Sequence, residues 1–230
     1  MSHHEPTLVL FFKRPKLGFG KQRLAASIGP EKAYQIAECL LLCATEDMKT
    51  WEGRCVFAVE ARDDLDWASA LLRREMAGSQ FDLIAQSEGN LGERLNHVDH
   101  YVRDKGAKHV YFIGSDAPIL SPKFYQFIFS QVSDYDITLA SSDDGGVTLM
   151  GGRKPWPDMI GLPWSTDSLG DELRSLCEEK HLSVKVLDGH YDIDTLTDLK
   201  RCIDDLRGDN RPQRKRLCKV FDELNLVGHG

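Results

Sequence analysis

The sequence predicts one α/β domain, built on a mostly parallel central sheet with helices on both faces. Two observations predict this class. Apolar runs of strand length alternate along the chain with longer segments in which apolar residues recur every third or fourth position. Residues 1–208 contain neither an internal repeat nor a linker. Strands that alternate with helices favour right-handed crossovers, which produce a parallel sheet buried on both sides.

The first half of the chain is expected to supply four strands and three helices. Residues 7–12 are apolar without polar alternation, which is typical of a strand buried on both faces. Pro30 suits the first position of a long helix whose apolar stripe runs to Met48. Gly106 ends a helix that begins near Leu91. The other elements predicted here are strands at 55–60, 81–86 and 110–113 and a helix at 66–76.

The second half is expected to supply three strands and three helices. Ser121 and Pro122 form an N-cap and a first helical residue, and this helix should run to about Val132. Thr195 can cap the last core helix, and Asp198, three residues later, can complete a capping box. The other elements predicted here are strands at 136–140, 147–150 and 183–187 and a helix at 168–180.

Composition excludes several classes of protein. The 230 residues are 41% hydrophobic and 28% charged, as in an ordinary globular protein, which excludes a disordered, collagen-like or low-complexity chain. No apolar run approaches the roughly 20 residues of a membrane-spanning helix, so no membrane span is expected. Residues 1–6 lack the basic stretch and the apolar core of a secretion signal, so we expect a cytoplasmic protein.

The end of the chain forms a separate basic segment. We expect the domain to occupy residues 1–208 and residues 209–230 to form a basic tail that contains a short helix. The tail could bind a nucleic acid or a membrane surface, but a solvated helix is favoured because the net charge of the chain is −7. No nucleic-acid partner is expected for so acidic a protein. The cations of the tail are Arg211, Arg214, Lys215, Arg216 and Lys219.

The six cysteines do not indicate a metal site or a disulfide framework. None of them forms a Cys-x-x-Cys pair, and a chain of this length needs no covalent cross-links. We therefore expect reduced, buried thiols.

The loop after the first predicted strand is strongly basic. Residues 1–30 contain five basic residues and one acidic residue, although the whole chain is acidic. Gly18 and Gly20 let backbone N–H groups approach an anion, and the surrounding cations add positive charge. The pattern is neither a Walker loop nor a Rossmann fingerprint. Ligands of α/β sheets bind at the carboxyl ends of strands, so this position favours a phosphate site over a plain basic surface loop. The cations are Lys13, Arg14, Lys16, Lys21 and Arg23.

Aspartates follow two other predicted strand ends. Asp116 comes just after the strand at 110–113. A buried aspartate there needs a charged partner or a metal ion, or else it caps the loop to Pro118 as a structural residue. Asp192 and Asp194 alternate as in a strand, so one of them should face away from the site while the other points to it. Carboxylate oxygens combined with phosphate oxygens are what Mg²⁺ or Mn²⁺ prefers. Asp116 and Asp194 therefore form a candidate metal pair.

Several motifs in this order resemble the DUF2064 family of bacterial glycosyltransferases, also called the radical-SAM/selenodomain-associated transferase 1 family. The family opening reads roughly F-x-K-x-P-x-x-G-x-x-K-T-R-L. The resemblance implies the GT-A fold of nucleotide-diphospho-sugar transferases. The matching residues are Phe12-Lys13-Arg14-Pro15, Gly18, Lys21-Gln22-Arg23-Leu24, Gln86, Gly89-Asn90-Leu91-Gly92-Glu93-Arg94, Ile113-Gly114-Ser115-Asp116-Ala117-Pro118, Asp144-Gly145-Gly146, Leu149, Gly151 and Trp164-Ser165-Thr166. The segment from Asp192 to Leu199 resembles the ending common to nucleotidyltransferases of the same superfamily.

The resemblance implies roles for the matched residues. By this resemblance, Lys13, Lys21 and Arg23 bind the phosphates together with Gly18 and Gly20. Arg94 lies in a matched motif at the same pocket. Asp116 would bind the metal ion, and Asp194 would complete its coordination shell. An acceptor pocket would include Gly145, Gly146 and Trp164, although ordinary packing is an equally good reading of Trp164. Asp144 is either a general base or a turn residue.

Two reactions fit these residues. The first is glycosyl transfer, in which an acceptor hydroxyl attacks a nucleotide sugar while the metal and the basic loop neutralise the departing diphosphate. The second is nucleotidyl transfer, as in the phospholactate guanylyltransferases, whose loop is loosely similar; there an acceptor phosphate attacks a nucleoside triphosphate and pyrophosphate leaves. Gln22 and Val147 depart from the family pattern, which keeps a third reading open, a nucleotide-binding module without catalysis.

Overall fold

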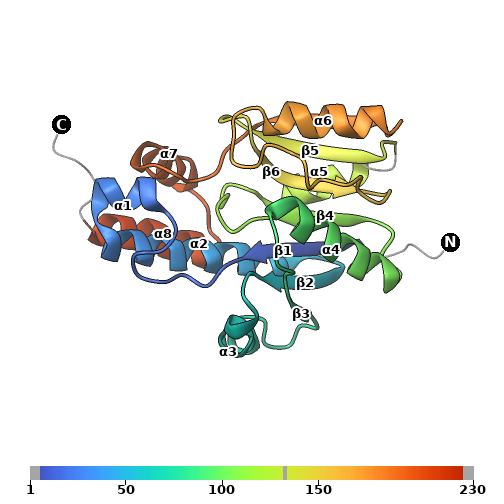
Figure 1. Ribbon diagram of the computed structural model, residues 1–230. Coiled ribbons are helices and arrows are strands. Elements are labelled where there is room, and N and C mark those ends of the chain that lie inside the picture. The colour runs from blue at the N-terminus through green and yellow to red at the C-terminus, as the bar shows by residue number, and fades with distance from the viewer. Residues whose placement is uncertain (1–5, 132–133, 225–230) are drawn as a thin grey trace.

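Seven strands form one sheet in the computed structural model, which describes residues 6–131 and 134–224. The strand order is β3-β2-β1-β4-β6-β5-β7 (Figure 1). Six strands run in the same direction, whereas β6 is antiparallel to both of its neighbours. The strands are β1 (Thr7–Phe12), β2 (Arg54–Val59), β3 (Asp82–Ala85), β4 (Val110–Ile113), β5 (Ile137–Ser142), β6 (Val147–Gly152) and β7 (Val184–His190). The predicted fold class, a mostly parallel sheet in an α/β protein, is confirmed.

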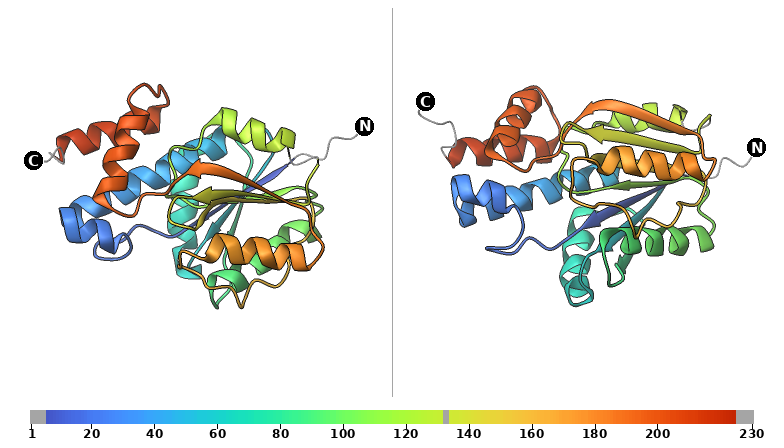
Figure 2. Two further views of the ribbon diagram at one scale, coloured as in Figure 1. Left: turned by 90° about the horizontal axis from the view of Figure 1, so that it is seen from above. Right: turned by 45° about the horizontal axis from the view of Figure 1, so that its top comes forward.

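Helices cover both faces of the sheet. On one face α2 (Pro30–Thr50), α3 (Leu65–Glu75) and α5 (Pro122–Gln131) pack against alternate strand residues such as Leu8 and Leu10. On the other face α4 (Leu91–Asp104) and α6 (Leu169–Glu179) pack against residues such as Val9. The view from above in Figure 2 separates the two helical layers. The first strand is therefore buried on both sides, as its unbroken apolar sequence requires.

A third apolar cluster lies beyond the carboxyl ends of the strands. It joins the first half of α2 to α1 (Gln22–Ile28), α7 (Leu196–Leu206) and α8 (Pro212–Glu223), and Figure 1 shows these helices together next to the arrowhead of β1. Leu24 of α1, Ile36 of α2 and Leu217 of α8 have no exposed surface. Helices from both ends of the chain thus form one body at the edge of the sheet where ligands are expected.

Most predicted elements are present, with bounds that differ by a few residues. The predicted caps are confirmed: Ser121 accepts a hydrogen bond from the backbone N–H of Phe124, and Thr195 forms a capping box with Asp198. The structure adds a second capping box at the start of α4 and a short helix, α1, where a loop was expected. The predicted end of α5 near Val132 lies outside the described residues, as do residues 1–5 at the start of the chain and residues 225–230 of the tail.

The basic tail contains the predicted helix, α8, but this helix is not simply solvated. Arg214 is fully buried, and its guanidinium donates to Asp47, Glu46 and the backbone oxygen of Pro118 at 2.7, 3.1 and 3.1 Å. The apolar side of α8 also packs on α2 and α7. The expectation of a solvated helix is therefore wrong for the side of α8 that carries Arg214. The sequence shows where the charged residues are, but not which of them form buried ion pairs.

The cysteines are free thiols, as their spacing predicted. All six cysteines are free, and five of them are buried. Among the described residues, the helices are too short or too polar for any of them to traverse a lipid bilayer.

Candidate active site

The topology places four aspartates at one edge of the sheet. Asp116 follows β4, Asp144 follows β5, and Asp192 and Asp194 follow β7; these three strands are parallel, so their carboxyl ends meet at the same edge. The segment after β7 then crosses back along this edge. The backbone N–H of Ile193 donates to the carbonyl oxygen of Asp116 at 2.9 Å, which fixes Asp194 beside the end of β4.

Lys21 occupies the centre of this edge. Its ammonium group lies 2.9 Å from Asp116 Oδ2 and 3.3 Å from Asp194 Oδ1, and it also donates to the backbone oxygen of Ile193. The Lys21 side chain is only 7% exposed. Burial alone lowers the pKa of Lys21, but Asp116, Asp194 and Asp192 outweigh burial and raise the pKa above its usual value. The ammonium is therefore charged at neutral pH and holds the two predicted metal ligands together.

The backbone of the basic loop aims Lys21 at this position. Lys21 has φ 48° and ψ 39°, a left-handed conformation in which it begins α1. Gly18 and Gly20 also have positive φ, and a Cβ on Gly20 would lie 3.1 Å from Cε of Lys13. The aliphatic stem of Lys13 therefore crosses the loop where Gly20 leaves room. Arg23, in the first turn of α1, reaches Asp194 at 3.6 Å and stays 73% exposed.

Two other cations of the loop are directed elsewhere. Lys16 and Arg14 pair with Asp64 at 2.9 and 3.4 Å, and Arg14 lies over the ring of Trp67 at 5.3 Å. These contacts fasten the loop to the start of α3. Lys13, Lys21 and Arg23, the three cations to which the family resemblance assigns the phosphates, are not engaged in this fastening.

Three of the aspartates form a cluster that the sequence reading did not anticipate. One oxygen each of Asp144, Asp192 and Asp194 lies within 4.8 Å of the others. The expectation that Asp192 and Asp194 face opposite ways is wrong, because residues 191–194 have no strand conformation. Burial raises the pKa of Asp192, and the nearby Asp144 carboxylate raises it further, while Ser142 donates to Asp192 at 3.0 Å. Three hard carboxylate oxygens this close fit a divalent cation such as Mg²⁺ or Mn²⁺.

Arg94 lies at the same edge of the sheet, beyond β1. Its NH1 donates to Glu60, which follows β2, and to Gln86, which follows β3, both at 3.1 Å. Its Nε is buried and has no hydrogen-bond partner among the described residues. The observed contacts of Arg94 tie the ends of β2 and β3 together at this edge.

The residues predicted for the acceptor pocket do not lie together. Gly145 and Gly146 line a cavity of about 280 Å³ between the ends of β5 and α6. Trp164 is absent from this lining; its indole N–H donates to the backbone oxygen of Met159 at 3.1 Å, and its ring packs among residues near α4. The contacts of Trp164 are those of a packing residue. Asp144 accepts from the backbone N–H of Gly146 at 3.1 Å, so it serves the turn and the aspartate cluster together.

Replacing Gly145 by alanine is expected to destabilise the protein strongly. Gly145 has φ 84°, and a Cβ there would lie 1.8 Å from the backbone oxygen of Asp167. The strained conformation and the overpacking together predict a loss of about 2–4 kcal/mol in the free energy of unfolding. Urea denaturation measures this loss. Gly161→Ala is the control, because a Cβ at Gly161 meets nothing within 4 Å; equal stability of the two variants would contradict the prediction.

The fold is shared with proteins of known structure. The seven-stranded α/β sheet has the GT-A type of fold found in nucleotide-diphospho-sugar transferases and cytidylyltransferases. A candidate nucleotide-diphospho-sugar transferase from Desulfovibrio desulfuricans G20 superimposes with a TM-score of 0.82, at 23% identity over 95% of this chain and 96% of that chain. The predicted fold is thereby confirmed.

More distant structures share the same architecture. The inositol-1-phosphate CTP transferase from T. maritima has a TM-score of 0.60, at 14% identity over 96% of this chain and 98% of that chain. The 4-diphosphocytidyl-2C-methyl-D-erythritol synthase from Anaerococcus prevotii DSM 20548 has a TM-score of 0.54, at 14% identity over 84% and 92%. The comparison with curated proteins yields no match.

The family follows from the sequence itself. The profile of the family described as "Uncharacterized protein conserved in bacteria (DUF2064)" matches residues 44–166, more than half of the chain. The protein belongs to the DUF2064 family, as its motifs predicted.

Proposed function

We propose that this protein is a divalent-metal-dependent transferase that uses a nucleotide-activated donor. The leading reaction is glycosyl transfer from a nucleotide sugar to the hydroxyl group of an acceptor. The observation that carries the proposal is the junction of Lys21 with Asp116 and Asp194, adjacent to the cluster that Asp194 forms with Asp144 and Asp192. The fixed ammonium group can bind a diphosphate, and the carboxylates at the same edge of the sheet can bind the cation that accompanies it.

The basic loop would hold the phosphates. Lys21 is preorganised by its two carboxylate partners, and Arg23 projects from the first turn of α1 with most of its side chain exposed. Lys13 crosses the same loop at Gly20. Preorganised positive charge stabilises a departing diphosphate without further rearrangement. Arg94, which the resemblance adds to this group, is held by Glu60 and Gln86 at the β2–β3 side of the edge.

Four carboxylates are available to a metal ion. Asp194 belongs to both groups: it shares Lys21 with Asp116, and it shares the cluster with Asp144 and Asp192. The predicted pair of Asp116 and Asp194 would bind a metal ion in place of the Lys21 ammonium, whereas the cluster could hold one beside it. Mg²⁺ or Mn²⁺ bound here would supply the remaining positive charge that a diphosphate requires.

The acceptor is proposed to approach from the β5–β6 turn. Gly145 and Gly146 line a cavity there. Asp144 does not line it, but it accepts from the backbone N–H of Gly146 and belongs to the aspartate cluster, so it connects the two. Asp144 is therefore suited to accept the proton of an acceptor hydroxyl. Trp164 is not part of this proposal, because its contacts lie elsewhere.

Nucleotidyl transfer is the second candidate. Two cytidylyltransferase-type neighbours cover most of this chain and carry CTP-derived activities in their names. The same cations would then neutralise a departing pyrophosphate. The products separate the two reactions: a nucleoside diphosphate released from a sugar nucleotide supports glycosyl transfer, and pyrophosphate released from a triphosphate supports nucleotidyl transfer.

A thermal-shift screen tests the common part of both reactions. We expect at least one nucleoside diphosphate, triphosphate or sugar nucleotide to raise the melting temperature, and to do so more in the presence of Mn²⁺, because a ligand that binds the native state stabilises it. Asp194→Asn should abolish the effect of Mn²⁺, since Asp194 belongs to both carboxylate groups.

Asp143→Asn is the matched control for this screen. Asp143 is adjacent to Asp144 in sequence, but it pairs with Arg201 rather than with the cluster. The Mn²⁺ and nucleotide responses of this variant should equal those of the wild type. If Asp194→Asn and Asp143→Asn behave alike, the proposed site is wrong. Binding of a nucleotide with Mn²⁺, but no turnover with any donor and acceptor, would instead support the non-catalytic module.

A further inference from the structure

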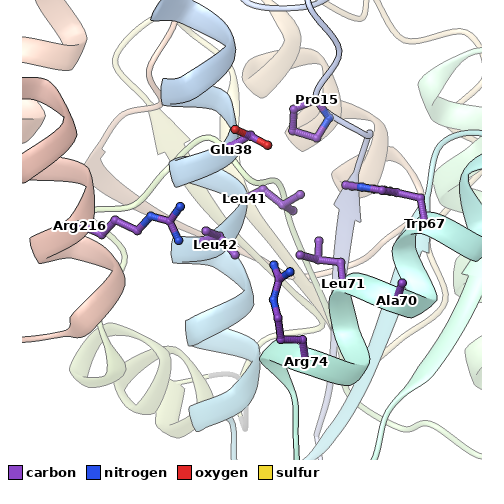
Figure 3. A pocket seen from close by; sticks show the side chains of 9 residues that line it. All are labelled: Pro15, Glu38, Leu41, Leu42, Trp67, Ala70, Leu71, Arg74 and Arg216. Carbon is purple, nitrogen blue, oxygen red and sulfur yellow. The ribbon is translucent and has the colours of Figure 1, made fainter. Parts of the chain in front are cut away.

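A second cavity lies on the α2–α3 side of the sheet, away from the aspartates. It has a volume of about 310 Å³ and is bounded by α2, α3, α8 and the start of the basic loop (Figure 3). We call it the α2–α3–α8 cavity. Its volume lies within the range of small-molecule sites. The lining residues are Pro15, Glu38, Leu41, Leu42, Trp67, Ala70, Leu71, Arg74 and Arg216.

The floor of this cavity is apolar. Leu41 and Leu42 of α2 are buried, and Leu71 and Trp67 of α3 are half-buried beside them. An aromatic ring and three leucines form a surface on which the apolar body of a small molecule can be buried. The floor therefore favours a ligand with a hydrocarbon or aromatic portion over a purely polar one.

Two arginines line the cavity, Arg74 from α3 and Arg216 from α8. Figure 3 shows the guanidinium groups of Arg74 and Arg216 approaching Leu42 from opposite sides. Arg74 uses Nε to contact Glu75 at 2.8 Å. Burial raises the pKa of the Cys39 thiol, and the nearby Arg216 opposes this effect. A guanidinium has five N–H donors, so each of these contacts leaves donors for an anion. The planar guanidinium of each arginine matches the geometry of a carboxylate or a phosphate.

The acidic residue of the cavity lies at the other end. Glu38 stands near Pro15 in Figure 3, and its carboxylate accepts a hydrogen bond from Tyr34 at 2.7 Å. Glu38 and Arg74 thus lie at opposite ends of the cavity, and Arg216 projects toward Leu42 from the α8 side, so the end away from Glu38 is the more positive. An anionic group would bind there, while the apolar body would extend over the leucines toward Trp67.

We infer that the α2–α3–α8 cavity binds a small organic anion, a carboxylate or a phosphate monoester carried on an apolar body. The apolar floor, the two arginines that line the cavity and the volume together define this class of ligand. The cavity is lined by none of the aspartates of the candidate active site. The inference therefore stands independently of the proposed transferase activity.

Calorimetric titration with three defined probes tests the inference. We expect 3-phenylpropionate or phenyl phosphate to bind saturably at one site, and the neutral 3-phenylpropan-1-ol to bind at least about fivefold more weakly, because charge-assisted hydrogen bonds are lost. The two anions show which of the two head groups is preferred. Failure of both anions to bind, or equal affinity for the alcohol, overturns the inference.

Variants locate the binding. Arg74→Gln and Arg216→Gln should each weaken the binding of the anion at least about fivefold, and Ala70→Phe should block the cavity. All three residues are exposed, so the fold should tolerate the changes. Arg73→Gln and Lys215→Gln are matched controls, because these exposed neighbours do not line the cavity. Binding that is unchanged in all three cavity variants, or equally weakened in the controls, contradicts the proposed location.

Discussion

Arg214→Met should lower the free energy of unfolding by about 3–5 kcal/mol, the cost of breaking a buried ion pair by removing one partner. Arg214 is fully buried and lies 2.7 Å from Asp47 and 3.1 Å from Glu46. Burial raises the pKa of Asp47 to about 6, against the opposing effect of Arg214 and Arg211. Removing the guanidinium therefore leaves a buried carboxylate with less compensation. Urea denaturation at neutral pH measures the loss.

The same substitution should also loosen the loop that carries Asp116. Arg214 donates to the backbone oxygen of Pro118 at 3.1 Å, and Arg211 donates to that of Leu120 at 2.9 Å, so the last helix holds the segment that follows β4. Lys215→Met, at an exposed neighbour on the same helix, should change stability by no more than about 0.5 kcal/mol. A loss below about 1 kcal/mol for Arg214→Met would show that the network contributes little.

Lys21→Met should produce the largest loss of function. The ammonium group bridges Asp116 and Asp194 and is the least exposed cation of the basic loop for which an ion pair is described. We expect turnover to fall by at least about 100-fold, as when one preorganised electrostatic group is removed from an active site. The stabilisation by nucleotide should fall as well. Steady-state kinetics with the donor identified by the thermal-shift screen, and nucleotide titrations of the melting temperature, measure these effects.

The response to Mn²⁺ should behave differently in this variant. Because the Lys21 ammonium occupies the position between Asp116 and Asp194, its removal leaves both carboxylates free for a cation. Mn²⁺ should therefore stabilise Lys21→Met at least as well as the wild type. Lys16→Met is the matched control, since Lys16 pairs with Asp64 at the start of α3. Full turnover in Lys21→Met, or an equal loss in Lys16→Met, would remove Lys21 from the mechanism.

Local sequence patterns predicted most of the fold. The apolar segment at the start of the chain forms β1 as expected, and the capping box at Thr195 begins α7. Such features depend on a few neighbouring residues, so the local sequence is sufficient to predict them. The helix α1 was missed because its seven residues follow a loop whose glycines and cations suggested irregular structure. The division of the chain after residue 208 stays a prediction.

The candidate site was predicted in part. The resemblance selected Lys21, Asp116 and Asp194, and the structure places all three in contact. It did not indicate Asp192 as a partner of Asp194, because alternation along a strand was assumed for residues that are not in a strand. The close spacing of aspartates before Thr195 was the sequence feature that could have indicated this partnership. Trp164 shows the opposite case, because its contacts are those of the packing reading rather than of the acceptor pocket.

The sequence by itself determined the α/β class, the family and the chemical character of the site, because strand and helix periodicities, caps and motifs are local properties. Only the tertiary structure decided that Lys21 stands between Asp116 and Asp194, that Asp192 joins Asp144, and that the basic tail is anchored by Arg214. These contacts join residues that lie far apart in the sequence. They depend on strand order and on the path of the segment after β7, which no local pattern specifies.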